Sequence, residues 1–411
     1  MMRIVSIAAC CLIVAACDDQ TTPIGPPGSA EPSLAAAGVP RDKVGNPASL
    51  AAIDPAFLVP GHYNVIYRQT ANARAVTAQI MNAHGLNPSH RWDEGWIKGF
   101  SGPMSDRQRD QLKRHPHVAY VNQVVIGTGA TTQSYPWNWG LDRIDQRALP
   151  LNNAYVYTDS APNVNVYILD TGIRRTHTDF GGRALLGTDI VTPGGTGNDC
   201  HGHGTFIAAI VGGTEYGVAK RSRLYAVRSS NCLNQVTSAN AITAANWVTN
   251  NHTKPAVAVF SVAFPGEVPE VDQAIYASIQ AGVTWVVAAG NDYKDACNHT
   301  PAHTLGTITV GATDRTDYRP AWSNFGPCLN LFAPGAELES AGIADDWDYR
   351  VDSGTSYSAP HVAGIAALYL GRYPTATVTT VKSAIVNGAT ANVVQNAGTG
   401  SPNKLAYSRF F

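Results

Sequence analysis

Charged residues are scarce in this sequence, and the two signs almost cancel. Asp, Glu, Lys and Arg make up 14% of the 411 residues, and the formal net charge is −1 at pH 7. No basic stripe interleaved with aromatic residues runs along the chain, so nothing provides a field to hold phosphates. We therefore expect no nucleic-acid partner. Hydrophobic residues make up 44%, which predicts a globular chain with room for more than one domain.

The apolar run at the start of the chain is too short to cross a bilayer as a mature helix. It covers Ile4 to Ala16 and follows a single positive charge, Arg3. We interpret residues 1–17 as a signal peptide. The sequence that ends it, Val-Ala-Ala-Cys17, resembles the lipobox of bacterial lipoproteins, which makes Cys17 a candidate for lipidation. The alternative is an ordinary signal peptide in which the alanines serve only the cleavage site.

Both interpretations of the leader place the mature protein outside the cytoplasm. We expect it to be secreted or lipid-anchored at the cell envelope, with a lipid anchor as its only contact with a membrane.

Cysteine is also infrequent. Three of the seven cysteines lie in the leader, and the other four are Cys200, Cys232, Cys297 and Cys328. Four cysteines allow three pairings, and the residues alone leave the choice open. No C-x-x-C spacing indicates a zinc knuckle or a redox pair, and an oxidising compartment favours disulfides. We therefore predict structural disulfides.

The N-terminal third divides into a tether and a small domain. Residues 18–58 are rich in Pro, Gly, Ser and Ala without an apolar period, which predicts a disordered tether. Residues 59–128 predict a small α+β, ferredoxin-like domain. Its expected elements are a strand at His62–Gln69, a helix at Asn72–His84, a strand at Trp96–Phe100, a helix at Ser105–Lys113 and a strand at Val118–Val125.

Residues 130–411 read as one larger α/β domain. Nearly continuous apolar runs, typical of buried parallel strands, alternate with helical patterns. The predicted strands are Val164–Asp170, Ala256–Val262, Val283–Ala289 and Thr307–Thr313, and the predicted helices are about 203–213, 238–250, 271–281 and 357–372. We expect a parallel sheet covered by helices on both faces.

Three residue types needed for nucleophilic catalysis stand in suitable settings. Asp170 closes a buried strand, where the active groups of open α/β sheets lie. His203, in His201-Gly-His203-Gly, opens an apolar helix, and Ser356 stands at the start of another, where the helix dipole favours negative charge. Each has an ordinary alternative: Asp170 as a turn cap, Ser356 as an N-cap, and the two histidines as surface residues or a metal pair.

The combination and its order favour catalysis. A serine hydroxyl needs an imidazole base, and the base needs a carboxylate to hold its tautomer. The chain order Asp170, His203, Ser356 is the one found in subtilisin, and it differs from that of α/β-hydrolase esterases. Those esterases also need Gly where Ser358 stands. Asn291, after an apolar strand, has a side-chain amide that can donate to an oxyanion, although turn asparagines are common.

Four segments resemble the signature blocks of the subtilisin superfamily: Val166–Gly172, His203–Thr205, Ala288–Asn291 and Gly354–His361. The resemblance covers roughly residues 130–410 and is closest to the proteinase K branch, especially aqualysin. Further matching segments are Trp139–Gln146, Gly290–Asp292, Ala296–Asn298 and Ser401–Leu405.

The resemblance implies a serine endopeptidase that acts on proteins and peptides. It implies that Asp170 orients the imidazole, His203 is the general base and later acid, Ser356 is the nucleophile and Asn291 completes the oxyanion hole. No cofactor is expected for catalysis, and a monomer is the family-like expectation.

The same resemblance implies several structural features. Disulfides are expected between Cys200 and Cys232 and between Cys297 and Cys328. Residues 59–128 resemble the propeptide that assists folding and then occupies the cleft as an intramolecular inhibitor, with cleavage near Gly129-Ala130. A structural calcium ion is expected at Asp314, with carbonyls near Pro301 as companions.

The sequence departs from the family in the blocks that face substrate. Ser261-Val262-Ala263-Phe264 stands where members usually have Ser-Leu-Gly-Gly, so added side chains should narrow the pocket lined by Ser261, Val262 and Ala263 or change the direction of this strand. Phe206 replaces the usual His, Tyr357-Ser358 replace the usual Met-Ala, His201 replaces the usual Asn, and Arg228–Asn231 lacks the usual Val-Leu-Asp.

None of these changes removes a catalytic group, so we favour an active protease with unusual or narrowed specificity. The main alternative is a pseudoprotease, a triad-bearing binding module whose pocket no longer admits extended peptides. A lipid or ester hydrolase would need a lid or an apolar binding helix, and the sequence offers no candidate for one.

Overall fold

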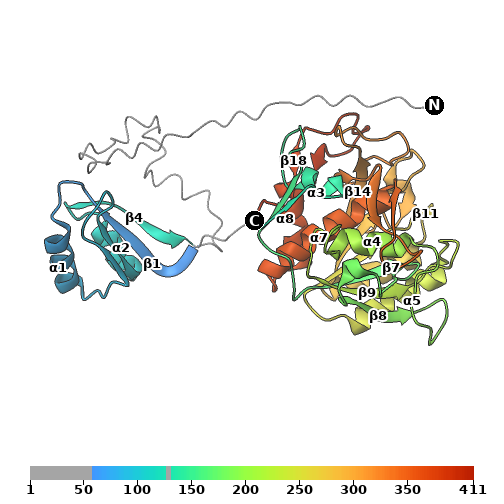
Figure 1. The fold of residues 1–411 in the computed structure, drawn as a ribbon, viewed down its shortest axis with the longest axis horizontal. Helices are drawn as coiled ribbons and strands as arrows, with labels where there is room; N and C mark the ends of the chain where they lie inside the picture. The colour runs from blue at the N-terminus through green and yellow to red at the C-terminus, as the bar shows by residue number, and fades with distance from the viewer. Residues whose placement is uncertain (1–57, 126–130) are drawn as a thin grey trace, which may run out of the picture. The chain divides into compact units, whose positions relative to one another are not determined.

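The computed structural model describes residues 58–125 and 131–411. The predicted signal peptide, Cys17, the tether and the predicted cleavage site at Gly129-Ala130 lie outside the described residues. The chain divides into two compact units, residues 1–127 and 128–411, and each is described by itself (Figure 1).

The smaller unit is a four-stranded antiparallel sheet with two helices. Its elements are β1 (Leu58–Tyr67), α1 (Ala73–His84), β2 (His90–Trp92), β3 (Gly99–Pro103), α2 (Asp106–Leu112) and β4 (Val118–Val125). The strand order β2-β3-β1-β4 is that of the ferredoxin-like fold, the class expected for this domain. Asn72 caps α1, and Ser105 with Gln108 forms a capping box on α2.

Two details of this unit differ from the prediction. The strand expected at Trp96–Phe100 begins at Gly99 instead, because Trp96 and Ile97 lie in a bend and are each 51% exposed. A Cβ at Gly99 would lie 2.0 Å from the carbonyl oxygen of Val65, so the close pairing of β3 with β1 needs glycine there. The short strand His90–Trp92 was not predicted, because its largely exposed residues carry no alternating pattern.

The larger unit contains a nine-stranded sheet. In spatial order its strands are β18 (Thr390–Ala391), β19 (Lys404–Leu405), β15 (Leu331–Pro334), β14 (Ile308–Thr313), β12 (Thr284–Ala288), β10 (Ala256–Phe260), β7 (Asn165–Asp170), β9 (Arg223–Arg228) and β8 (Ala184–Asp189). Neighbouring strands run parallel except β18 and β19.

Helices and short strand pairs complete this unit. The helices are α3 (Trp139–Ile144), α4 (His203–Gly212), α5 (Ser238–Asn251), α6 (Pro269–Gln280), α7 (Thr355–Arg372) and α8 (Val378–Gly388), with single 3-10 turns at Thr178–Phe180 and Ala296–Asn298. The pairs are β5 (Thr131–Ser134) with β6 (Ala154–Tyr157), β11 (Phe264–Pro265) with β13 (His299–Thr300), and β16 (Leu338–Ala341) with β17 (Tyr349–Asp352).

Helices cover both faces of the sheet, as the sequence predicted. Along β7, Val166 and Ile168 point into the core formed with α4 and α7, whereas Tyr167 and Leu169 point into the core formed with α5 and α6. All four side chains are at most 2% exposed. This alternation explains why the strand reads as a continuous apolar run, because each face of the sheet has its own hydrophobic layer.

The sheet order places a crevice beside β7. The chain runs from β7 outward to β8 and β9, then crosses to β10 on the opposite side of β7. In an open parallel sheet such a reversal opens a crevice at the carboxyl ends of the two strands. Asp170 ends β7 and Ser261 directly follows β10, so both border this point. Figure 1 shows α4 and α7 near the middle of the unit, where they pack against each other.

The two predicted disulfides are present: Cys200–Cys232 and Cys297–Cys328. They close segments with sequence separations of 32 and 31 residues.

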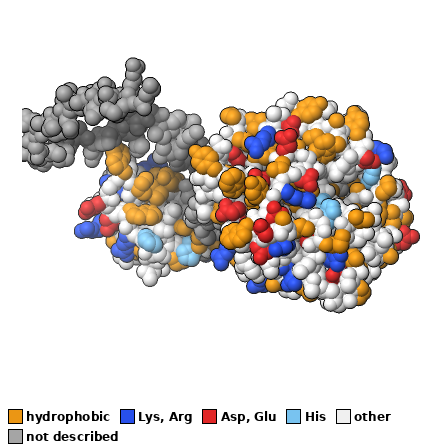
Figure 2. All heavy atoms as spheres, turned by 45° about the vertical axis from the view of Figure 1, so that its right-hand side comes forward, with side chains coloured by type: hydrophobic (Ala, Val, Ile, Leu, Met, Phe, Trp, Pro, Cys, Tyr) orange, Lys and Arg blue, Asp and Glu red, His pale blue; other side chains and the backbone are white. Residues whose placement is uncertain are grey.

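On the face of the larger unit shown in Figure 2, acidic and basic side chains are interspersed among hydrophobic ones. Within residues 58–125 and 131–411, no helix is both long enough and apolar enough to span a membrane.

Candidate active site

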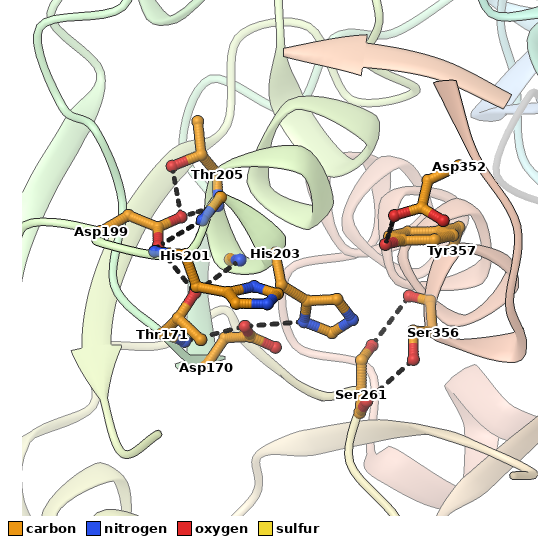
Figure 3. A network of polar contacts seen from close by, with 12 residues as sticks. Asp170, Thr171, Asp199, His201, His203, Thr205, Ser261, Asp352, Ser356 and Tyr357 are labelled. Atoms are coloured by element: carbon orange, nitrogen blue, oxygen red, sulfur yellow. Dashed lines mark hydrogen bonds and ion pairs between the residues drawn. The ribbon is translucent and has the colours of Figure 1, made fainter. Parts of the chain in front are cut away.

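Asp170 is a buried carboxylate aimed at an imidazole. It is the last residue of β7 and is 1% exposed. Its Oδ1 accepts the backbone N–H of Thr171 at 2.8 Å and lies 2.8 Å from Nδ1 of His203 (Figure 3). A carboxylate in this position holds the proton on Nδ1 and leaves Nε2 free to accept one. Asp170 can therefore orient a base, which is more than the turn cap that one interpretation of the sequence allowed.

His203 is held at the first position of α4 by the loop that precedes it. The Asp199 carboxylate accepts the N–H groups of His201, Gly202 and Thr205 at 2.8–2.9 Å. Gly202, the residue before the helix, has φ +95°, a conformation that glycine adopts without strain. His203 is only 6% exposed, so the position of its imidazole is set by the protein rather than by solvent.

The charge environment of His203 favours its protonated form. Burial lowers the pKa of the imidazole, but the charge and hydrogen bond of Asp170 outweigh burial, and the pKa lies above its ordinary value. Asp199 also raises the pKa and Arg350 lowers it. A base that gains a proton easily from a nucleophile and remains neutral above its raised pKa suits general base catalysis.

Within the part of the chain that the structure describes, no third ligand accompanies His201 and His203 to form the metal site that the sequence left open. Their ring centroids are 6.3 Å apart, and His203 Nδ1 is already engaged by Asp170. Among the described residues, no group of three or more His, Cys, Asp or Glu side chains is arranged to hold a metal ion.

Ser356 is the second residue of α7 and is tied to the segment after β10. Pro360 has no N–H, so the Ser356 carbonyl has no partner four residues ahead in the helix. The hydroxyl of Ser261 donates to this carbonyl at 3.0 Å. In return, the Ser356 hydroxyl donates to the Ser261 carbonyl at 3.0 Å. The pair of serines thus joins α7 to the end of β10.

The Ser356 hydroxyl is therefore turned toward Ser261 rather than toward His203. Figure 3 shows the imidazole of His203 between Asp170 on one side and the Ser356–Ser261 pair on the other. A rotation about the Cα–Cβ bond of Ser356 redirects the hydroxyl without moving the backbone. Catalytic hydrogen bonds in structures without substrate are commonly long or misaligned, so this rotamer is compatible with a nucleophile.

Asn291 follows the carboxyl end of β12 and reaches the same place. Its Oδ1 accepts the backbone N–H and the hydroxyl of Thr355, at 2.8 and 2.9 Å. Because the carbonyl end of the amide is held in this way, the Nδ2 donor is directed beside the start of α7, where it would lie 3.5 Å from a Cβ at Gly354. This fixed donor next to the helix N-terminus is what an oxyanion site requires.

A pocket of about 300 Å³ opens beside Ser356. All three predicted substrate-facing residues line it, and so do Asn291 and two titratable groups. The lining residues are Asn234, Ser261, Val262, Ala263, Pro265, Ala288, Gly290, Asn291, Asp292, His299, Thr355 and Ser356.

One wall of the pocket carries the methyl group of Ala263. Gly290 also lines the pocket, and a Cβ built on it would lie 3.7 Å from this methyl. The space beside Gly290 is therefore narrower with alanine at position 263 than it would be with glycine there.

Several site residues were not identified from the sequence. Asp199 organises the His203 loop, Thr355 holds Asn291, and His299 meets Asp292 in the pocket with 3.1 Å between Nε2 and Oδ2. The interaction with Lys294 at 2.9 Å and those with Asn324 and His299 keep the pKa of Asp292 below its usual range against the opposing effect of burial. The only signal in the sequence was proximity along the chain, since Asp199 stands shortly before His203 and Thr355 directly before Ser356.

A comparison with family models matches residues 161–406 to the subtilase family. The extracellular serine proteinase of Thermus sp. strain Rt41A is 42% identical over an alignment of 384 residues, which covers 88% of this chain and 93% of the Thermus protein. The chain belongs to the subtilase family.

Other subtilases support this assignment. Alkaline serine exoprotease A of Vibrio alginolyticus is 39% identical over 76% of this chain and 59% of its own length. The crystal structure of a cold-adapted subtilisin-like serine proteinase matches with a TM-score of 0.64 and 41% identity, over 66% of this chain and 97% of the solved one. The protein is thus a serine-type endopeptidase of the subtilase family with the subtilisin-like α/β fold.

The residues around Asp314 do not fit the calcium site expected from the resemblance. Asp314 Oδ1 accepts three hydrogen bonds within its own turn, from Thr316 N, Thr316 Oγ1 and Tyr318 N. The carbonyl of Ala302, next to Pro301, accepts a hydrogen bond from Thr309 Oγ1 at 2.7 Å. Thr309 stands five residues before Asp314, a distance of about 16 Å along the extended chain at ~3.3 Å per residue. The expected carbonyl companions therefore lie near the other end of β14, and no role in the mechanism is assigned to calcium.

Proposed function

We propose that this subtilase is an exported serine endopeptidase that uses Asp170, His203 and Ser356 as its catalytic triad. The observation that supports this proposal is the convergence of three elements at the carboxyl edge of the sheet. The end of β7 brings Asp170 within 2.8 Å of His203 at the start of α4, and Ser356 at the start of α7 stands beside the same imidazole and the pocket.

The proposed reaction proceeds in two steps. His203 Nε2 takes the proton of the Ser356 hydroxyl as Oγ forms a bond to the carbonyl carbon of the peptide. The same proton then passes to the leaving nitrogen as the C–N bond breaks, which leaves an acyl-enzyme. In the second step His203 Nε2 takes a proton from water as the water oxygen forms a bond to the acyl carbon, and passes that proton to Ser356 Oγ as the ester C–O bond breaks, which releases the acid. Asp170 stabilises the imidazolium, and Asn291 Nδ2 donates to the oxyanion, a contribution of roughly 2.7–4 kcal/mol in a comparable enzyme.

Proteins and peptides are the proposed substrates. The segment of Ser261, Val262 and Ala263 would pair with the extended backbone of the substrate and border the pocket for the residue before the cut. Because the Ala263 methyl narrows this pocket, we propose a preference for small residues there.

Maturation is proposed to be autocatalytic. Residues 59–128 would act as an intramolecular inhibitor and folding aid until cleavage near Ala130. The strand β5, which begins at Thr131 and pairs with β6, would then start the mature enzyme, which we expect to be a monomer. Export through the leader is proposed from the sequence, and the Thermus relative is named as an extracellular proteinase. Lipidation of Cys17 stays a prediction.

The intact mass of the protein expressed without its leader tests the proposal. We expect the parent chain to lose its propeptide near Ala130 in protease-deficient cells, and the Ser356→Ala variant to stay full length. A folded parent chain that also stays intact would contradict the proposed function. It would favour the pseudoprotease, for which the Ser356 hydroxyl turned toward Ser261 is the one supporting observation.

A further inference from the structure

Two departures from the family pattern lie in contact behind the catalytic imidazole. Phe206 and Tyr357 have ring centroids 4.4 Å apart, and the Tyr357 ring lies 5.5 Å from that of His203. Both aromatic side chains are at most 3% exposed. Tyr357 therefore forms a wall for His203 on a side that Asp170 does not occupy. We call Phe206, Tyr357, Arg350 and Asp352 the aromatic–ionic cluster.

The hydroxyl of Tyr357 is anchored to the strand that precedes the catalytic helix. It donates to Asp352 Oδ2 at 2.6 Å, as Figure 3 shows. Burial has the largest effect in raising the pKa of Tyr357, and this hydrogen bond raises it further, so the phenol remains a neutral donor. A hydrogen bond to a carboxylate is among the stronger ones that a neutral group makes, so it restricts the rotation and tilt of the ring.

Arg350 completes the cluster from the same strand, β17. Its Nη2 lies 3.3 Å from Asp352 Oδ2 and 3.4 Å from the Tyr357 hydroxyl. Its guanidinium also lies over the Phe206 ring, 5.4 Å from the centroid, and its Nη1 would be 3.3 Å from a Cβ at Gly202, the residue before His203. The cluster thus connects β17, α4 and α7 around the base.

We propose that Tyr357 is a positioning residue for His203, held in place by the Asp352–Arg350 pair. This inference depends on the proposed function, because it assigns a role in the reaction of that same triad. The Tyr357 ring limits the movement of the imidazole between Asp170 and Ser356, and the hydrogen bond to Asp352 keeps the ring in that position. The charge of Arg350 opposes protonation of His203, and Asp352 partly neutralises that charge.

The groups that face His203 come from four parts of the chain. They are Asp170 on β7, Asp199 and His201 in the loop before α4, Arg350 on β17, and Tyr357 on α7. Arg350 is the one among them that lowers the pKa of His203 by its charge, which gives its removal a distinct sign.

The first test compares Tyr357→Phe with the parent enzyme. The substitution keeps the ring and removes only the hydroxyl, so packing around His203 is preserved. We expect kcat to fall about tenfold, in keeping with the sensitivity of rates to small misplacements, while KM stays within about twofold. Tyr349→Phe is the matched control, because Tyr349 lies on β17 with Arg350 and Asp352 but is 61% exposed. It should behave like the parent enzyme.

The second test follows the acid limb of kcat/KM in charge variants. Arg350→Met removes the cation and should move the limb upward by about half a pH unit, whereas Asp352→Asn leaves the cation less neutralised and should move it downward. Arg223→Met, at an exposed arginine at the start of β9, removes the same charge elsewhere and should not move the limb. A role in packing alone predicts no opposite shifts of this kind.

The outcomes separate this inference from the proposed function. An active parent enzyme whose kcat and acid limb are unchanged in all three cluster variants would overturn the inference alone. An inactive parent enzyme would refute the proposed function, and NMR titration of His203 in a Ser356→Ala background would still measure the opposite shifts. If Tyr357→Phe failed to fold by thermal melting, the two charge variants would decide.

Discussion

Replacing Ala263 by glycine should widen the pocket beside Ser356 and change which peptide bonds are cut. Ala263 and Gly290 both line the pocket, and the Ala263 methyl lies 3.7 Å from the position that a Cβ at Gly290 would occupy. The pocket has a volume of about 300 Å³. Because the methyl belongs to the pocket lining, its removal enlarges the space available to a flat aromatic side chain.

The magnitude follows from the cost of one carbon in a hydrophobic pocket. One methylene more or less changes discrimination by about 1–3 kcal/mol, or about 10- to 200-fold. We therefore expect Ala263→Gly to raise kcat/KM for a peptide with Phe before the cut, relative to the same peptide with Ala, by at least about tenfold. The added backbone freedom should cost about 0.5–1 kcal/mol of stability.

The assay compares two peptides that differ only in the residue before the cleaved bond. Ala281→Gly, at the end of α6, is a control that adds the same backbone freedom away from the pocket. It should leave the Phe-to-Ala ratio unchanged. A ratio that is also unchanged in Ala263→Gly, in a folded and active enzyme, would refute the assignment of this methyl as the group that narrows the pocket.

Two further predictions concern the base and the disulfides. Asp170 outweighs burial and raises the pKa of His203, and the base must be neutral to act, so the acid limb of kcat/KM should lie above the ordinary histidine value. An acid limb below that value in the parent enzyme would contradict this prediction. Asp170→Asn should lower kcat by about 10⁴-fold. The double variant Cys297→Ser/Cys328→Ser opens a loop with a sequence separation of 31 residues, which should reduce the free energy of unfolding by about 4 kcal/mol in the chain-entropy model. Denaturant melts of this variant measure that loss, and an unchanged midpoint would show that the bridge adds no stability.

Much of the fold could be predicted because each face of the large sheet has its own hydrophobic layer. The strand predicted at Val164–Asp170 is found at Asn165–Asp170, and the helix predicted from about residue 357 begins at Thr355. The edge strand β2 was missed, since an exposed strand of three residues needs no apolar pattern. Its pairing with β3 is set by tertiary contacts instead.

The calcium expectation at Asp314 illustrates the limit of a motif. The resemblance concerned residues near Asp314 in the sequence, but a cation site depends on which carbonyls come together in space. In the structure the Asp314 carboxylate serves its own turn, and Ala302 contacts the other end of the strand.

The residue types themselves determined the class of the protein and the chemistry that it can perform. A carboxylate at a strand end, and an imidazole and a hydroxyl at helix starts, keep those settings in any arrangement of the sheet, because the settings are local. Tertiary structure alone decided that the Ser356 hydroxyl turns to Ser261, that the Ala263 methyl faces Gly290, and that Tyr357 and Phe206 meet behind His203. Each of these contacts joins segments distant in the chain, so its existence depends on how strands and helices pack and not on any pattern within one segment.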